Sequence, residues 1–125
     1  MMLSVLLSWS SGIILILLGL LHNLSGGPMM SRWLGRVSPP LAAQDALLGR
    51  VGWDFGGYLL MAVGISFLIL GRSLPASYHL FWAIIVVVLG GILFYLFREP
   101  LFLLFLVAGL FMGAYYVYTA FYLGR

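Results

Sequence analysis

The sequence predicts an all-α integral membrane protein, a single-domain, up-and-down bundle of four helices that takes up residues 1–125. Hydrophobic residues make up 64% of the 125-residue chain and charged residues only 7%, whereas roughly a quarter of the residues in soluble domains are charged. The apolar residues form four continuous runs, each close to the ~20 residues that a helix needs to cross the hydrocarbon core. They do not alternate with polar residues, as the strands of a membrane barrel would.

The first predicted span covers residues 3–24. Ser25-Gly26-Gly27-Pro28 follows it, and such a cluster of helix-breaking residues is expected to end the helix. The run has no positively charged segment before it and no small-residue cleavage site after it, so it lacks two marks of a secretory signal. We therefore expect a retained transmembrane helix.

Residues 25–52 form a polar connection with amphipathic pieces. Pro40 suits the first turn of a helix, and Leu41, Leu47 and Leu48 lie within one broad stripe at helical spacing. A short helix on the membrane surface, between the first and second spans, is the structure that this pattern predicts.

The remaining spans are predicted at residues 53–70, 78–97 and 100–122. Pro100 stands in the first turn of the last span, where a proline is tolerated. The loops on the side of the 25–52 connection carry more arginine than the loops on the side of the chain ends. By the positive-inside rule both termini should lie outside the cytoplasm, and we expect the inner membrane of a bacterium.

Small residues predict which helix faces meet other helices, because membrane helices associate through close backbone approach rather than through hydrophobic burial. The last span carries two glycines at small-x-x-x-small spacing. The predicted packing residues are Ser8, Gly12, Gly57, Gly64, Gly90, Gly109 and Gly113. For each of them, helix packing is favoured over a direct ligand role.

One membrane face of the predicted bundle collects most of the ionisable side chains. The first span ends there, the second begins, the third ends and the fourth begins. The candidate ligand or proton site on this face consists of His22, Asn23, Arg50, Trp53, Asp54, Arg98 and Glu99. Ionisable groups near the hydrocarbon boundary are expensive unless paired or hydrated, so we expect His22 and Asp54 to face each other inside the bundle.

Each of these residues also has a purely structural interpretation. Arg98 and Glu99 place a cation at a helix C-terminus and an anion at an N-terminus, which helix dipoles favour. Asp54 in the first turn of the second span could serve exposed N–H groups there. His22 could bond only to a carbonyl or to water at the interface. The sequence leaves these alternatives open.

Several chemistries are disfavoured. His22 and His79 fall at opposite ends of the bundle, too far apart for a haem between two histidines. The chain has no Cys, and His22, Asp54 and Glu99 make too thin a ligand set for zinc. Its scattered arginines form no stripe that would follow nucleic-acid phosphates. We expect no metal, no cofactor and no nucleic acid.

Two segments carry a family resemblance, GLLHNLSGG at residues 19–27 and GWDFGGYLLMAVG at residues 52–64. With these segments the chain resembles the small, mostly uncharacterised bacterial four-helix membrane proteins near the DoxX-like group. The resemblance implies a four-helix bundle and says little about activity.

Three functions compete on this basis. The first is a non-catalytic accessory or structural subunit that packs against lipid, other transmembrane subunits or further copies of itself. The second is a protein in which a His22 and Asp54 site, with Glu99, binds or transports a lipophilic, quinone-like molecule or relays protons. The third is a lipid isomerase or reductase that uses the same three residues as acid and base. It ranks last, so we do not expect an enzyme.

Overall fold

The computed structural model describes residues 2–71 and 73–124, and within these residues every regular element is helical. Four stretches are long and apolar enough to cross a membrane, and they confirm the predicted all-α four-helix bundle. The chain is therefore a small multi-pass membrane protein. Its elements are α1 (Met2–Leu24), α2 (Gly26–Leu34), α3 (Ala43–Leu70), α4 (Ala76–Phe97), the 3-10 turn η1 (Pro100–Phe102), α5 (Leu103–Val117) and the π-helical turn η2 (Tyr118–Tyr122).

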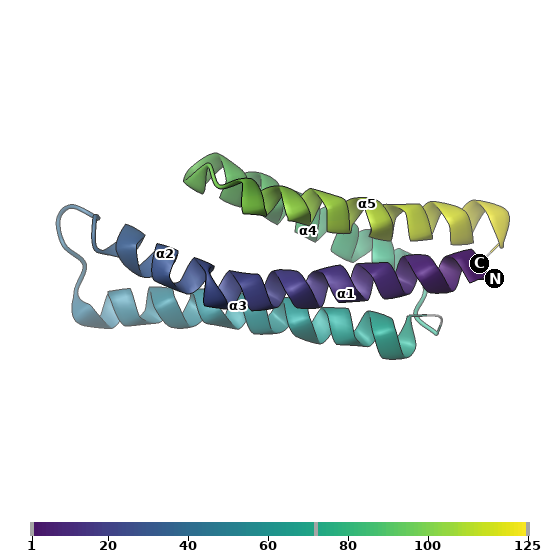
Figure 1. The fold of residues 1–125 in the computed structure, drawn as a ribbon, viewed down its shortest axis with the longest axis horizontal. Helices are drawn as coiled ribbons and strands as arrows, with labels where there is room; N and C mark the ends of the chain where they lie inside the picture. Colours follow the sequence, from purple (N-terminus) through teal and green to yellow (C-terminus); the bar gives the residue numbers. More distant parts are fainter. Residues whose placement is uncertain (1, 72, 125) are drawn as a thin grey trace.

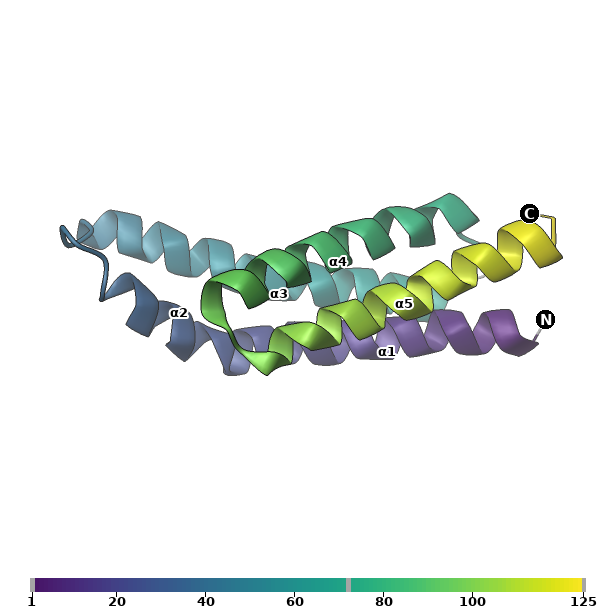
Figure 2. The ribbon, with the colours of Figure 1, turned by 90° about the horizontal axis from the view of Figure 1, so that it is seen from above.

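The helices form two layers (Figure 1). The antiparallel pair α1 and α3 makes one layer, and α4 with α5 makes the other. Helix α1 also packs against α5 and so joins the layers, and both chain termini lie at the same end of the bundle (Figure 2). The outward faces are apolar, with Ile69 and Leu110 more than 70% exposed. Such faces suit contact with lipid tails.

Two glycine contacts hold the backbones of α1 and α3 together. A Cβ atom at Gly12 would lie 2.7 Å from the carbonyl oxygen of Gly64, and a Cβ atom at Gly19 would lie 2.5 Å from that of Gly57. The glycines are seven residues apart on each helix, so the two contacts fall on one face of the pair, two turns apart. Gly19 is not among the predicted packing residues, although its spacing from Gly12 signals the shared face.

Glycines also allow close approach in the second layer, between α4 and α5, although one predicted glycine does not take part. Gly90 faces the Phe105 side chain, and Gly109 faces the side chain of Val87, so both lie in the α4–α5 contact. A Cβ atom at Gly113 would meet nothing within 4 Å. The expected packing role of Gly113 is thus corrected, because the small-x-x-x-small pair of α5 uses only its first member for close approach.

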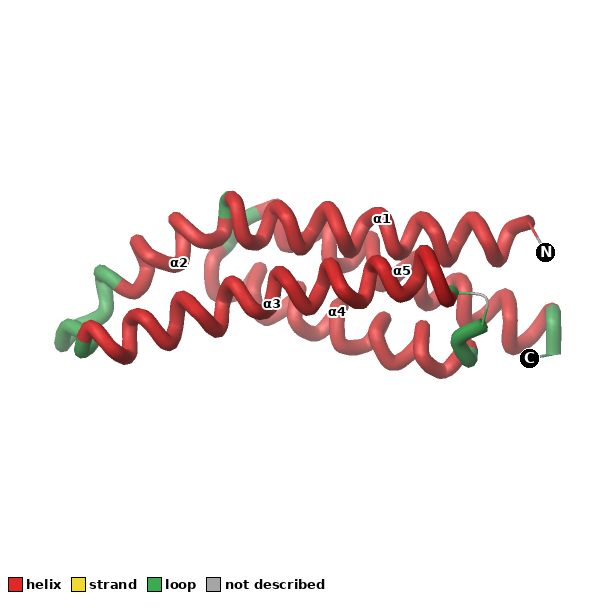
Figure 3. The backbone as a smooth tube through the Cα atoms, turned by 90° about the horizontal axis from the view of Figure 1, so that it is seen from below, coloured by secondary structure: helices red, strands yellow, loops and turns green. Residues whose placement is uncertain are grey.

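The connection between the first two spans differs from the prediction. Helix α2 starts directly after Ser25, because Pro28 falls in the first turn of α2, where its missing N–H and fixed φ are tolerated. Helix α3 starts at Ala43, ten residues before the predicted second span. Residues 41–48 therefore form no separate surface helix. Instead, α2 and the beginning of α3 extend the α1–α3 pair beyond the α4–α5 turn and run along the bundle (Figure 3).

Candidate ligand-binding site at the rim of the bundle

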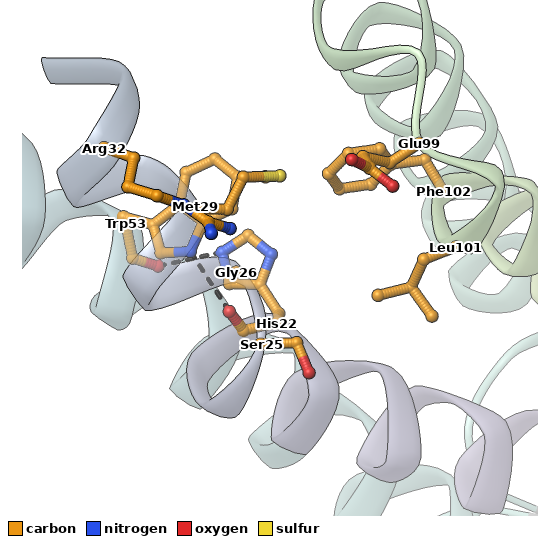
Figure 4. Close-up of a pocket in the computed structure, with 9 residues that line it drawn as sticks. All are labelled: His22, Ser25, Gly26, Met29, Arg32, Trp53, Glu99, Leu101 and Phe102. Carbon is orange, nitrogen blue, oxygen red and sulfur yellow. Dashed lines mark hydrogen bonds between the residues drawn. The ribbon is translucent and has the colours of Figure 1, made fainter.

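The end of α1 is joined to α3 through His22 and Trp53. The two rings stack with centroids 4.2 Å apart and planes inclined by 11°. Nε1 of Trp53 donates to the carbonyl oxygen of His22 at 3.1 Å, and Nε2 of His22 lies 3.0 Å from the carbonyl oxygen of Trp53 (Figure 4). Each residue thus binds the other's backbone, and His22 is held with only 8% of its surface exposed.

This geometry determines which ring nitrogen of His22 is free. A carbonyl oxygen only accepts hydrogen bonds, so Nε2 carries the hydrogen, and Nδ1 of the neutral ring keeps its lone pair. Nδ1 is buried and has no hydrogen-bond partner among the residues that the structure describes. Figure 4 shows it on the side of the ring that faces Leu101 and Glu99. His22 therefore keeps a buried, unused acceptor on the side of its ring that faces that space.

A cavity of about 210 Å³ lies beside the His22 ring. It is bounded by the junction of α1 and α2, by α3 and by the turn between α4 and α5 (Figure 4). Most of its wall is apolar, with one imidazole, one guanidinium and one carboxylate among the lining groups. Apolar walls with few placed polar groups are typical of small-molecule sites. The lining residues are His22, Ser25, Gly26, Met29, Arg32, Trp53, Glu99, Leu101 and Phe102.

Asp54 is paired with Arg50 and has no hydrogen bond with His22, so the expected pair of His22 and Asp54 does not form. Its carboxylate accepts from Nε of Arg50 at 3.1 Å, and Nη1 of Arg50 also donates to Gly27 and Ser31 of α2 at 3.1 and 2.7 Å. Residues four apart on a helix are neighbours, so Arg50 forms an ion pair with the Asp54 carboxylate. Trp53, one residue earlier on α3, takes the place opposite His22. Arg50 and Asp54 therefore fasten α2 to α3 and do not line the cavity.

Two further candidates lie outside the cavity. The Asn23 amide fills the notch that Gly57 leaves on α3, where a Cβ atom would overlap it. Arg98 ends α4 in the left-handed conformation, with φ of 57°, and its guanidinium lies 5.0 Å from the centroid of the Tyr95 ring. Of the seven candidates, the cavity therefore gathers His22, Trp53 and Glu99.

Sequence reasoning missed the part of the wall that comes from α2. Ser25, Met29 and Arg32 follow His22 at helical spacing, so a helix that continued past Ser25 would have placed them on the His22 face. Gly26 belongs to the same wall, because a Cβ atom there would lie 2.8 Å from the Trp53 indole. The expected helix end at Ser25 concealed this pattern.

The second histidine stands at the opposite end of the bundle in a closed setting. The ring of His79 is stacked between Phe67 at 4.5 Å and Tyr115 at 3.7 Å, and it has no exposed surface. Its Nε2 lies 3.5 Å from Oγ of Ser8, which donates to the carbonyl oxygen of Phe67. Polar contacts between helices stabilise their association in a membrane. His79 therefore packs the bundle, whereas His22 lines the cavity at the rim.

Comparison with protein-family models, with curated proteins and with solved structures finds no match to this chain. Within residues 2–71 and 73–124, no three His, Asp or Glu side chains come together as a metal site would require. The fold and the cavity thus define the class: a small four-helix membrane protein with a pocket at one rim of its bundle.

Proposed function

We propose that this protein binds a small lipophilic molecule in the rim cavity, and that the molecule donates a hydrogen bond to Nδ1 of His22. The observation that supports this function is the buried, unpartnered lone pair of Nδ1. A buried acceptor without a partner costs roughly 1–3 kcal/mol, and a donor on a ligand in the cavity would remove that cost.

The apolar wall of the cavity and the Nδ1 acceptor of His22 indicate which chemical class of ligand would bind. Met29, Leu101 and Phe102 offer apolar contact to the body of the ligand. The Nδ1 lone pair favours a hydroxyl or amine over a group that only accepts. A phenol, a quinol or a lipid alcohol satisfies both conditions, whereas an oxidised quinone has no hydrogen to donate.

The other two functions have less support. An accessory role would rest on the apolar outer faces alone, and such faces suit lipid as well as partner helices. A lipid isomerase or reductase would need Asp54 beside His22, and Asp54 is bound to Arg50 instead. Ligand binding has a specific observation in its favour, because the unpartnered Nδ1 atom belongs to His22, which lines the rim cavity.

Equilibrium binding of para-hexylphenol and of its methyl ether, measured with the full chain in lipid nanodiscs, tests the proposal. The phenol carries the required donor and the ether does not. We expect saturable phenol binding that is about tenfold tighter than ether binding, a difference that corresponds to one hydrogen bond. In His22→Phe the two affinities should become equal.

A cavity-filling variant supplies the control. Leu101→Trp places an indole in the cavity and should abolish binding, whereas Leu103→Trp adds the same ring at a position that is 43% exposed and outside the cavity. Leu103→Trp should bind like the unmodified chain. Equal affinities for phenol and ether in the unmodified chain, or no saturable binding of either, would contradict the proposed function.

A further inference from the structure

A second cavity, of about 400 Å³, adjoins the rim cavity and shares Met29, Arg32 and Glu99 with it. We call the rim cavity the inner chamber and this one the outer chamber. The outer chamber also includes Arg36, and exposed or half-buried apolar side chains complete its wall. Its lining residues are Met29, Arg32, Trp33, Arg36, Leu96, Phe97 and Glu99.

The charged groups of the two chambers are not neutralised by the protein itself. Within the part of the chain that the structure describes, the only ion pair joins Arg50 to Asp54. Arg32, Arg36 and Glu99, which are all exposed, line these adjoining cavities without an ion-pair partner among the described residues. Two guanidiniums and one carboxylate along adjoining cavities suit a ligand that carries charges of both signs.

The order of groups along the two chambers matches one kind of molecule. His22 lines only the inner chamber, Arg32 and Glu99 line both, and Arg36 lines only the outer one. The inner chamber offers apolar contact and the His22 imidazole, the two chambers share one guanidinium and one carboxylate, and the outer chamber adds a second guanidinium. Guanidinium groups favour phosphate, and a carboxylate accepts hydrogen bonds from a primary ammonium.

We infer that the ligand is a monoacyl phospholipid with a phosphoethanolamine head group. Its acyl chain contacts the apolar wall of the inner chamber, and its free glycerol hydroxyl donates to Nδ1 of His22. The phosphate lies between Arg32 and Arg36, and the ammonium lies at Glu99. This inference rests on the proposed function, because it names the substrate class of the same site.

Each part of the head group contributes a separate selectivity. Phosphate binding to Arg32 and Arg36 is common to all phospholipids and sets their general affinity. A choline head group has no N–H to donate to Glu99 and is therefore disfavoured. A glycerol head group leaves the ligand with a net negative charge and Glu99 without a cation, so it is disfavoured as well.

Native mass spectrometry of the full chain in a neutral detergent measures these preferences. The probes are lysophosphatidylethanolamine, lysophosphatidylcholine and lysophosphatidylglycerol with the same acyl chain. We expect the ethanolamine lipid to bind about fivefold more tightly than either of the others, an increment typical of one charge-assisted hydrogen bond at a partly exposed site.

Three variants assign the selectivity to its residues. Glu99→Gln should make the ethanolamine and choline lipids bind equally. The double variant Arg32→Gln, Arg36→Gln should weaken all three lipids by about tenfold or more. Arg98→Gln removes the charge beside Glu99, and because Arg98 lines neither chamber, this control should bind like the unmodified chain.

The outcomes separate this inference from the function on which it rests. No head-group preference, a preference for the glycerol lipid, or an unchanged preference in Glu99→Gln would overturn the inference. If para-hexylphenol still binds saturably in that case, the proposed function stands. Failure of the phenol as well would overturn both.

Discussion

Replacement of Gly64 by Leu should separate α1 from α3 and destabilise the bundle by about 3 kcal/mol, the upper end of the usual cost of overpacking. A Cβ atom at this position would lie 2.6 Å from the carbonyl oxygen of Gly12 and 3.0 Å from the backbone nitrogen of Ile16. Both obstacles are backbone atoms of the partner helix, so no rotamer change relieves the clash. Unfolding of the purified protein in mixed micelles with increasing SDS, followed by circular dichroism, measures this loss.

Gly113→Leu is the matched control for that experiment. A Cβ atom there would meet no atom within 4 Å, so the same substitution should change the free energy of unfolding by no more than about 0.5 kcal/mol. Equal losses in the two variants would show that a leucine side chain is unfavourable at any glycine of the bundle, and that close backbone approach does not govern the result.

Trp53→Ala should have the second large effect, a loss of about 3 kcal/mol, as for other buried tryptophans. The variant loses the stack on His22, the hydrogen bond to the His22 carbonyl oxygen and an edge contact with Phe97 at 5.6 Å. It also removes one wall of the inner chamber. The same SDS titration measures the loss of stability.

Two control variants separate the contribution of the Trp53 hydrogen bond from that of its buried ring. Trp53→Phe keeps an aromatic ring and removes the Nε1–H donor, so it should cost only about 1 kcal/mol. Trp9→Ala removes an indole that is 52% exposed and should leave the stability nearly unchanged. A Trp53→Ala variant as stable as Trp9→Ala would mean that the contact between His22 and Trp53 does not hold the end of α1.

The four spans could be predicted from the sequence because helix length and bilayer thickness leave little freedom. A run of about 20 apolar residues has one economical structure in a membrane, where every backbone group must be bonded internally. Up-and-down connection then brings His22, Trp53 and Glu99 to one rim, whatever the details of packing. The depth of the site therefore followed from topology.

The details of the site depended on choices between alternative local structures and alternative ion-pair partners. The sequence pattern does not decide between these alternatives. Pro28 can end one helix or begin the next, and in this chain it stands in the first turn of α2. Asp54 had two possible partners, and Arg50, on the same helix, captured it. A neighbour four residues away needs no tertiary fit, whereas a contact with His22 would have required a particular rotation of α3.

The two histidines show why residue type alone did not identify the site. Each is stacked on an aromatic ring, yet His79 is enclosed by all four spans, whereas His22 lines a cavity. What separates them is the space beside the ring, which depends on the packing of α2 and the α4–α5 turn.

Nitrogen-15 solid-state NMR of histidine-labelled protein in bilayers tests the central claim most directly, because the chain contains only two histidines. We expect Nε2 of His22 to be protonated and Nδ1 to carry a lone pair. On addition of para-hexylphenol, the Nδ1 signal should shift as it accepts a hydrogen bond, and the His79 signals should stay in place. A His22 ring protonated on Nδ1, or a Nδ1 signal that the phenol leaves unchanged, would contradict the account.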